Sequence, residues 1–443
     1  MSAEIYAARR ARLAAKLGDG VAILHGAPTR IRSNDTDYSY RQDSDFFYLT
    51  GLVEPGAICV LAPGPTYTVF VRPRDRDRET WEGRCLGVER AVEALGADAA
   101  YSVLEFKECL PELLGSASRI YTDLNLDENV TRRALGSLHV GRRRRQKEGS
   151  GVRALEDVGA LLHGLRLIKD AEELALMRRS AELAGAAHSR AMAVARPGML
   201  ESELEAEIDY VFRRGGGSGP AYGSIVASGA NGTILHYVDN NRRMEDGDLV
   251  LIDAGVELGL YCSDVTRTFP VSGRFTSVQR AAYEVVLEAQ LAAIDVCRSG
   301  LPQSGVHEIA TRHLVEGMIE LGLVSGSVDS VLESGDHRRF YMHGTSHWLG
   351  LDVHDVGAYK ENGEACALEP GMVLTVEPGL YVREDEEGVP DELRGLGIRI
   401  EDDVLVTSGN PEVLSDGVPK DADEVEALVG SSTRVVLPGI DPL

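Results

Sequence analysis

The sequence has 443 residues, of which 43% are hydrophobic, and its 46 basic and 70 acidic residues give a formal net charge of −24 at pH 7. A chain this long exceeds the ~250–300 residues at which a single hydrophobic core usually stops growing, so we expect two domains. The negative charge disfavours a nucleic-acid partner, and no apolar run approaches the ~18 residues of a membrane span, so neither nucleic acid nor membrane is an expected partner.

The amino-terminal part alternates helix and strand signals, which predicts a small mixed α/β domain over residues 1–165. The predicted elements are a helix near residues 3–17, strands near 21–24, 58–61 and 66–71, and a helix near 88–95. Residues 142–147 are basic and flanked by glycines, which predicts a flexible connection. A strongly helical pattern then opens a second domain, residues 166–443, with further helices over 277–321.

The second domain contains a pair of β-type segments that carry two acids. Residues 249–253 are apolar and end in Asp253, and residues 261–269 alternate, so the two segments are predicted to form a hairpin. A turn centred on residues 258 and 259 would set Asp253 directly opposite Asp264, with Cβ atoms about 5 Å apart. Two buried carboxylates at that spacing repel each other unless a cation lies between them, which indicates a metal site.

A second acid-bearing β pair follows. MVLTVEPGLYV carries Glu377 and GIRIEDDVLVT carries Glu401, and pairing about residues 389 and 390 would set these acids opposite each other. The long loop between them fixes the register less firmly than a tight turn does. His347, in HGTSHWLGLDVHDVG, supplies an imidazole. Four carboxylates and one imidazole predict a site for two divalent ions, Mn²⁺ in the first place, with Co²⁺, Fe²⁺ or Zn²⁺ as alternatives.

These motifs resemble those of a known family. LIDAG, SDVTRTF, HGTSHWLGLDVHDVG, TVEPGLY and GIRIEDD, together with YRQDSDFFYLTG and ETWEGRCLG, are similar to aminopeptidase P, the Xaa-Pro aminopeptidases of the creatinase and methionine aminopeptidase superfamily. The resemblance covers nearly the whole chain and implies a creatinase-like N-terminal domain followed by a pita-bread catalytic domain. It also implies that Asp253 binds one metal ion, that Asp264 and Glu401 bridge both ions, and that His347 and Glu377 complete the other.

The implied reaction is hydrolysis of the bond between an N-terminal residue and a penultimate proline. A hydroxide between the two ions would attack the carbonyl carbon, since paired divalent ions lower the pKa of a shared water. Glu377 would carry the proton to the leaving proline nitrogen, a general acid/base role. By the same resemblance, His354 would donate a hydrogen bond to the carbonyl oxygen as negative charge develops.

Three more residues enter the site by resemblance. A lone histidine is more often structural than catalytic, but His343 lies only four residues before His347. The resemblance implies that His236 and His343 line the cleft near the proline of the substrate. It implies that Arg399 joins the carboxylate of Asp253 to Tyr381, a contact that would orient the ligand.

Other enzyme classes fit the sequence less well. HEIATRH lacks the second zincin histidine, because Thr311 occupies that place. The glycines of residues 215–219 do not complete a dinucleotide-binding motif, Ser346 lies in no nucleophile elbow, and the basic run 142–145 is typical of a solvated surface. Two alternatives remain: the first is a prolidase specific for Xaa-Pro dipeptides, and the second is a member of the fold without metal, either a non-catalytic binding module or a creatinase-like enzyme. The family motifs disfavour the first and the complete ligand set disfavours the second.

The cysteines indicate a reducing cytoplasm. The six cysteines show no close pairing and no metal-type spacing, and the arginine-rich N-terminal helix lacks the apolar stretch of a signal peptide. Cys262 lies two residues before Asp264, on the same strand face, where thiol reagents or soft metals could inhibit, and burial without a function is the favoured alternative. The resemblance further implies a homo-oligomer, a dimer or tetramer, in which Asp35 and Trp81 reach toward a neighbour's active site.

Overall fold

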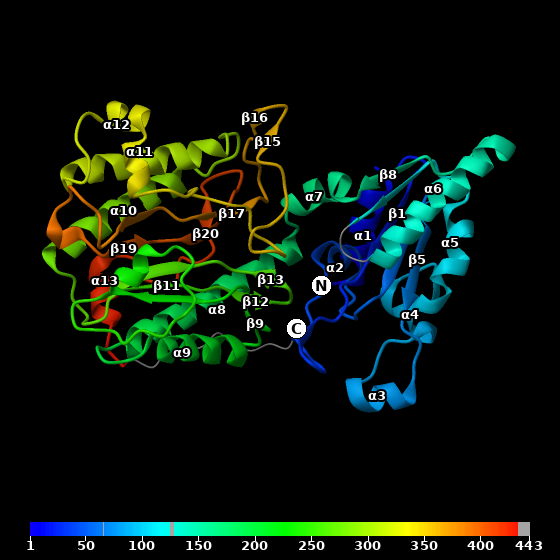
Figure 1. Ribbon diagram of the computed structural model, residues 1–443, viewed down its shortest axis with the longest axis horizontal. Coiled ribbons are helices and arrows are strands. Elements are labelled where there is room, and N and C mark those ends of the chain that lie inside the picture. The colour runs from blue at the N-terminus through cyan, green and yellow to red at the C-terminus, as the bar shows by residue number, and fades with distance from the viewer. Residues whose placement is uncertain (65, 125–127, 433–443) are drawn as a thin grey trace. The chain divides into compact units, whose positions relative to one another are not determined.

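The computed structural model describes residues 1–64, 66–124 and 128–432, and the chain divides into two compact units, Met1–Arg166 and Leu167–Leu443. Each unit has its own sheets and helices, as Figure 1 shows. In the described residues, no helix combines the length and the apolar character that crossing a membrane requires.

The first unit contains a six-stranded mixed sheet with the order β6-β5-β4-β1-β7-β8. Its antiparallel centre is joined on either side by parallel strands. The strands are β1 (Val21–His25), β4 (Ile58–Ala62), β5 (Thr66–Val71), β6 (Ala99–Ser102), β7 (Arg119–Thr122) and β8 (Ala154–Asp157). The remaining elements are α1 (Ala3–Ala14), the hairpin β2 (Ile31–Ser33) and β3 (Thr36–Asp37), α2 (Ser44–Thr50), α3 (Arg76–Glu82), α4 (Val88–Leu95), η1 (Val103–Glu105), and α7 (Gly159–Leu167) at the division.

Helices α5 (Phe106–Leu114) and α6 (Glu128–Glu148) bury their apolar faces against this sheet. The expected mixed α/β character is confirmed, but the prediction of a flexible connection at residues 142–147 is wrong, because these residues lie inside α6. Arginine and lysine are good helix formers. Gly141 also lets the helix pack on Val152, since a Cβ there would lie 2.3 Å from the Val152 carbonyl oxygen.

The second unit contains two antiparallel halves, each backed by a pair of helices. In the first half, β10 (Ile225–Ser228), β11 (Leu249–Asp253) and β14 (Thr266–Pro270) form a sheet that packs on α8 (Ala171–Val194) and α9 (Glu201–Arg214). A smaller sheet continues it, with β9 (Gly219–Pro220), β12 (Val256–Leu258) and β13 (Tyr261–Cys262). The segment η2 (Gly229–Thr233) follows β10.

In the second half, β17 (Val373–Val376), β20 (Asp402–Leu405) and β21 (Glu412–Val413) form one sheet, and β18 (Gly379–Val382) pairs with β19 (Leu396–Arg399). Helices α10 (Ser277–Asp295) and α11 (Ser304–Glu320) cover it, on the side opposite α8 and α9 (Figure 1). The other elements are α12 (Val328–Ser334), η3 (Asp336–Arg339), β15 (Lys360–Glu361), β16 (Glu364–Ala365), η4 (Asp391–Leu393) and α13 (Ala422–Leu428). Two helix-backed halves of this kind are the expected pita-bread arrangement.

The register of the first acid-bearing pair differs from the prediction by two residues. Asp253 pairs with Thr266 rather than with Asp264. The turn lies at Gly259 and Leu260, whose φ angles are +58° and +70°, and not at residues 258 and 259. Two consecutive positive φ angles are typical of the tight hairpin turns that match strand twist. A shift of two residues keeps Asp264 on the predicted face of the strand.

The register of the second pair agrees with the prediction. Val376 pairs with Asp402, and Gly379 pairs with Arg399, so Glu377 lies across from Glu401. The two halves meet at an isolated bridge between Thr266 and Glu401. That bridge brings the acids of the first half to those of the second.

Candidate metal centre and active site

One cavity of about 720 Å³ in the second unit gathers the residues singled out from the sequence. Its volume lies within the ~300–1,000 Å³ that is usual for small-molecule and peptide-end sites. The predicted residues among its lining are Asp253, Asp264, His347, Glu377, Glu401, His236, His343, His354 and Arg399. The structure therefore brings all of them to one cleft.

The four acids lie at or beside the ends of strands, where the β structure of each half of the second unit is interrupted. Asp253 ends β11 and Asp264 precedes β14, while Glu377 follows β17 and Glu401 precedes β20. Residues at such breaks have backbone groups outside the regular ladder, and their side chains can turn into a cavity. Gly255 makes the first break compact, since a Cβ there would lie 1.7 Å from the carbonyl oxygen of Ser263.

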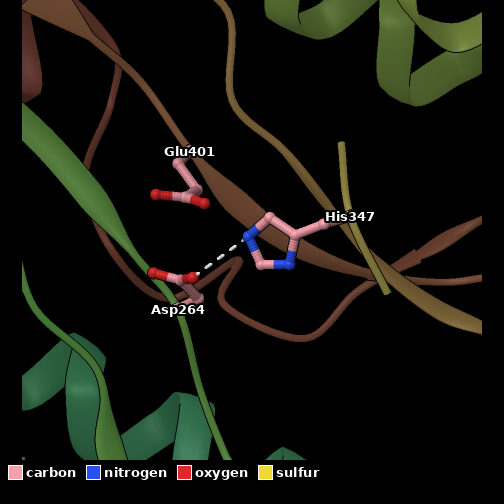
Figure 2. Close-up of side chains that lie close together, drawn as sticks. All are labelled: Asp264, His347 and Glu401. Atoms are coloured by element: carbon pink, nitrogen blue, oxygen red, sulfur yellow. Dashed lines mark ion pairs between the residues drawn. The ribbon is translucent and has the colours of Figure 1, made fainter. Parts of the chain in front are cut away.

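Asp264, His347 and Glu401 form the tightest group of potential metal ligands in the described residues. Each offers one ligand atom, and these atoms all lie within 4.8 Å of one another. Figure 2 shows the imidazole pointing at Asp264 with Glu401 beside it, and the His347 Nε2 to Asp264 Oδ2 distance is 3.4 Å. His347 Nδ1 donates to the carbonyl oxygen of Trp348 at 3.1 Å. This hydrogen bond fixes the tautomer and leaves Nε2 for a metal ion.

The two remaining acids adjoin this group. Glu377 Oε1 lies 3.5 Å from Nε2 of His347. Asp253 is joined to Asp264 through Tyr222, whose hydroxyl lies 2.6 Å from Asp253 Oδ1 and also contacts Asp264 Oδ1. The five predicted ligands thus form one continuous cluster.

Burial and mutual repulsion raise the pKa values of three acids in this cluster. Burial, followed by the charges of Asp264 and Glu377, raises the pKa of Glu401 well above its ordinary value. Burial also raises the pKa of Glu377 to about 7, with Asp264 adding to the rise against the opposing charge of His347. Burial, and then the charge of Asp253, raises the pKa of Asp264 despite its hydrogen bond with His347. These carboxylates need a counter-charge to be ionised together.

The neighbouring acids also change the pKa of the His347 imidazole. Burial alone would lower its pKa, but the hydrogen bond and charge of Asp264, with the charge of Glu377, raise the pKa to about 9. Only histidines lie within ion-pair distance of Asp264 and Glu377 in the described residues. A divalent cation would supply the missing charge, so the donor set and its electrostatics fit a metal centre.

A hydrogen-bonded chain leads away from Asp253. Arg399 donates from one guanidinium nitrogen to Asp253 Oδ2 at 2.6 Å and from another to the Tyr381 hydroxyl at 3.0 Å. Tyr381 in turn donates to His343 Nε2 at 2.8 Å, because His343 Nδ1 already donates to the carbonyl oxygen of Gly344 at 2.8 Å. Burial, and then the charge of Arg399, lowers the pKa of His343 to about 4. His343 is therefore neutral, with both ring nitrogens engaged.

His354 and His236 complete the histidines of the cleft. The His354 ring packs edge-on against His347, with ring centroids 4.4 Å apart. Burial, and then the neighbouring His347, lowers the pKa of His354. The side chain of His354 lines the cavity, where it is a neutral hydrogen-bond donor. His236 lies on the segment that follows η2 and lines the same cavity.

Comparison with known proteins adds independent information about this chain. The model of "Metallopeptidase family M24" matches residues 175–408, and that of "Aminopeptidase P, N-terminal domain" matches residues 6–121. An Xaa-Pro aminopeptidase of Escherichia coli strain K12 is 43% identical over 442 residues, covering 98% of this chain and 99% of that protein. The chain belongs to the aminopeptidase P family of M24 metallopeptidases.

Solved structures agree with this assignment. Pseudomonas aeruginosa aminopeptidase PepP has a TM-score of 0.94 at 46% identity, covering 97% of this chain and 98% of its own. A zinc-substituted E. coli aminopeptidase P in complex with product has a TM-score of 0.94 at 42% identity, covering 98% and 99% of the two chains. The predicted aminopeptidase P resemblance, two-domain fold class and Xaa-Pro aminopeptidase function are confirmed.

Some residues of this aminopeptidase P site were not predicted from the sequence. Tyr222 contacts two of the acids, and Thr266 donates from Oγ1 to Glu401 Oε2 at 2.6 Å. Asp403 is buried behind the site and accepts the backbone N–H of Asp264 at 3.2 Å. Asp403 and Thr266 had a signal, since they lie in GIRIEDD and SDVTRTF, whereas Tyr222 lies in no such motif and had none.

The cysteines are free in the structure, as the spacing indicated. Cys262 is buried in β13, with its Sγ 3.6 Å from the carbonyl oxygen of Leu351. Burial of this thiol agrees with the expectation that it does not take part in the reaction of the aminopeptidase P site.

Proposed function

We propose that this Xaa-Pro aminopeptidase uses divalent metal ions bound by Asp253, Asp264, His347, Glu377 and Glu401 to remove the N-terminal residue from peptides whose second residue is proline. The observation that supports this proposal most strongly is the cluster of Asp264, Glu377 and Glu401 around the His347 imidazole, to which the Tyr222 hydroxyl joins Asp253. Such a cluster is costly to bury without cations. Bound divalent ions would activate water and polarise the scissile carbonyl.

The chain's own residues then have separable roles. Glu377 is the proton carrier, because its carboxylate borders the cavity beside His347, within reach of a substrate bound there. His354, neutral and facing the cavity, donates a hydrogen bond to the oxygen that gains negative charge. His236 and His343 form walls for the proline, and Arg399 holds the Asp253 carboxylate in its binding orientation.

For the metal itself we propose Mn²⁺. The predominance of carboxylate oxygen in the donor set favours a hard or borderline divalent ion, and one imidazole is compatible with Mn²⁺, Co²⁺ and Zn²⁺. The zinc-substituted E. coli relative indicates that zinc can replace the usual ion in that protein. Activity after reconstitution with each ion at equal occupancy would rank them, and the proposal expects Mn²⁺ to give the highest kcat/KM.

The function is tested with matched peptides. Purified protein is assayed for release of the first residue from Xaa-Pro-Pro, Xaa-Ala-Pro and Xaa-Pro. We expect rapid cleavage of Xaa-Pro-Pro and little cleavage of Xaa-Ala-Pro. Faster cleavage of the Xaa-Pro dipeptide would identify a prolidase instead, and no release from any of the three peptides would contradict the proposal.

We further propose a cytoplasmic homo-oligomer in which residues 1–165 form the assembly domain and residues 166–443 the catalytic domain. Trp81 supports this, because its side chain on α3 is 89% exposed and exposed tryptophan is typical of contact surfaces. Asp35, in the exposed β2–β3 turn, is assigned the same role. Cell fractionation with sedimentation of the purified protein tests the location and the oligomer.

If assembly completes the substrate cleft, Trp81→Ala should reduce kcat/KM for long peptides about tenfold, while an Xaa-Pro-Pro tripeptide loses less than twofold. Leu104→Ala, another exposed apolar side chain of the first unit, is the control. Equal losses on long and short peptides would contradict the proposed contribution of Trp81.

A further inference from the structure

Glu201 is a buried carboxylate outside the metal centre that binds the segment carrying His236. It is the first residue of α9 and its side chain has no solvent exposure. One oxygen, Oε1, accepts hydrogen bonds from the backbone N–H and the hydroxyl of Ser228, both at 2.7 Å, and from Asn231 Nδ2 at 3.1 Å. The other, Oε2, accepts from the Tyr237 hydroxyl at 2.8 Å and from the backbone N–H of Arg242 at 2.9 Å.

These donors span one stretch of chain, residues 228–242, which we name the His236 segment. Beyond η2, residues 234–242 contain neither strand nor bridge, the isolated bridge of Leu200 with Arg243 following directly after them, so few backbone hydrogen bonds fix these residues. Buried backbone groups need partners, and a single carboxylate satisfies two N–H groups of the His236 segment. Charge-assisted hydrogen bonds of this kind are stronger than neutral ones.

Side-chain alternation connects this contact to the cleft. His236 and Val238 are exposed and line the cavity, while Tyr237 between them is buried against β10 and β11 residues and donates to Glu201. A turn of Tyr237 away from Glu201 would therefore rotate its two neighbours relative to the cavity. The orientation of His236 depends on where the Tyr237 hydroxyl is held.

We propose that Glu201 is a positioning residue for the reaction, acting through the His236 segment to hold the His236 imidazole against the substrate. The inference rests on the proposed function, since it assigns the purpose of the contact to the cleft. Glu201 touches neither the metal ligands nor the cavity in the described residues. Its effect on catalysis is indirect.

The first test is Glu201→Gln, which keeps the shape of the side chain but replaces one acceptor oxygen by an NH₂ group facing N–H or O–H donors. We expect kcat/KM on Xaa-Pro-Pro to fall between about tenfold and hundredfold, as is usual for partners that orient active-site groups. Glu173→Gln is the control, because Glu173 is likewise a buried glutamate near a helix start that accepts a tyrosine hydroxyl, that of Tyr261 at 2.9 Å. The control should change kcat/KM by less than twofold.

A double-mutant cycle separates positioning from general stability. In a His236→Ala background, Glu201→Gln should cost less than threefold, because its effect passes through the missing imidazole. An unchanged fold-loss in that background would overturn the proposal, as would kcat/KM within twofold of wild type for Glu201→Gln alone. If Glu201→Gln does not fold, Tyr237→Phe removes one donor and is tested by the same cycle.

Hydrogen exchange gives a readout that needs no activity. Peptides covering residues 228–242 should exchange faster in Glu201→Gln, while peptides from β17 and β20 exchange as in the wild type. Unchanged exchange in the His236 segment would overturn the positioning role. If the wild type cleaves no Xaa-Pro peptide, the proposed function fails, and the exchange experiment still decides whether Glu201 holds this segment.

Discussion

Arg399 links Asp253, a proposed metal ligand, to His343, which lines the cleft, through its planar guanidinium and the hydroxyl of Tyr381. Its guanidinium contacts Asp253 and Tyr381 from different nitrogens, and Tyr381 reaches His343. A guanidinium presents several N–H groups in a rigid fork, whereas the ammonium of lysine is a single point charge on a flexible chain. The two contacts together therefore require arginine.

Arg399→Lys should lower kcat/KM by about tenfold to hundredfold, because one ammonium cannot hold both the ligand and the tyrosine. Arg383→Lys, at an exposed arginine that pairs with Asp385 on the surface, should leave it unchanged. Steady-state kinetics on a fluorogenic Xaa-Pro-Pro peptide measures both. A loss below twofold for Arg399→Lys would show that the fork is not needed.

Single residues also mark the limit of sequence reasoning for this site. The four acids and His347 could be predicted from residue types that suit a metal ion, and His236, His343 and His354 from the family resemblance. Tyr222 could not be predicted, because it lies in none of the motifs, and the role of Thr266 could not, because SDVTRTF does not indicate which acid its hydroxyl contacts. Their hydrogen bonds exist only after distant segments have been brought together.

For the two β pairs, the register that we expected to be less certain was predicted correctly, and the register that we expected to be more certain was not. The pair with the long loop has the predicted register, with Glu377 across from Glu401. The pair with the tight turn is shifted by two residues, because Leu260 adopts a positive φ that leucine rarely takes and the sequence did not indicate. Asp264 consequently lies beside Gly255, where the strand is interrupted, and not across from Asp253.

Gly255 therefore controls the spacing of the first pair of acids. In Gly255→Ala, the new Cβ would overlap the Ser263 carbonyl oxygen, so the two segments must separate. We expect a loss of about 1–3 kcal/mol in the free energy of unfolding, together with weaker metal binding. Gly417→Ala is the control, since a Cβ there meets no atom within 4 Å. Urea denaturation and metal titration measure the free energy of unfolding and the metal affinity of both variants. Equal values for the two variants would contradict the role given to Gly255 in spacing the acids.

For the whole molecule, the metal centre should link stability to pH. In the metal-free protein, Glu377 has a pKa raised to about 7 and His347 a pKa raised to about 9, so the folded state binds more protons than the unfolded state. Both groups therefore stabilise the folded metal-free protein at low pH, and this contribution to the free energy of unfolding is lost as the pH rises. Glu377 loses it between about pH 4.5 and 7, and His347 between about pH 6.5 and 9. A bound cation reverses this dependence, because it keeps both groups deprotonated in the folded protein while the unfolded chain still takes up protons as the pH falls.

We therefore expect the Tm of metal-stripped protein to fall steadily between pH 5 and pH 9 relative to that of the Mn²⁺-loaded protein. Scanning calorimetry of both forms across this range measures the difference. Melting curves that remain parallel at every pH would mean that the cluster is not the source of the linkage.

The general architecture followed from the sequence because two long helix-backed β segments and an α/β first unit each leave strong periodic signals. The continuation of α6 through residues 142–147 could not be predicted from the sequence. Gly141, one of the glycines that suggested a linker, instead permits close packing of the helix on Val152. Glycine occurs both in flexible connections and at close packing contacts, and the local sequence does not distinguish these two roles.

The most direct test of the account measures metal content and activity together. Protein stripped of metal is titrated with Mn²⁺, and bound metal and Xaa-Pro-Pro hydrolysis are followed in the wild type and in Asp264→Asn. The account predicts that activity appears with metal, that the wild type binds two ions per chain, and that folded Asp264→Asn loses both metal and activity. Full activity in the metal-free wild type, or in Asp264→Asn, would contradict it.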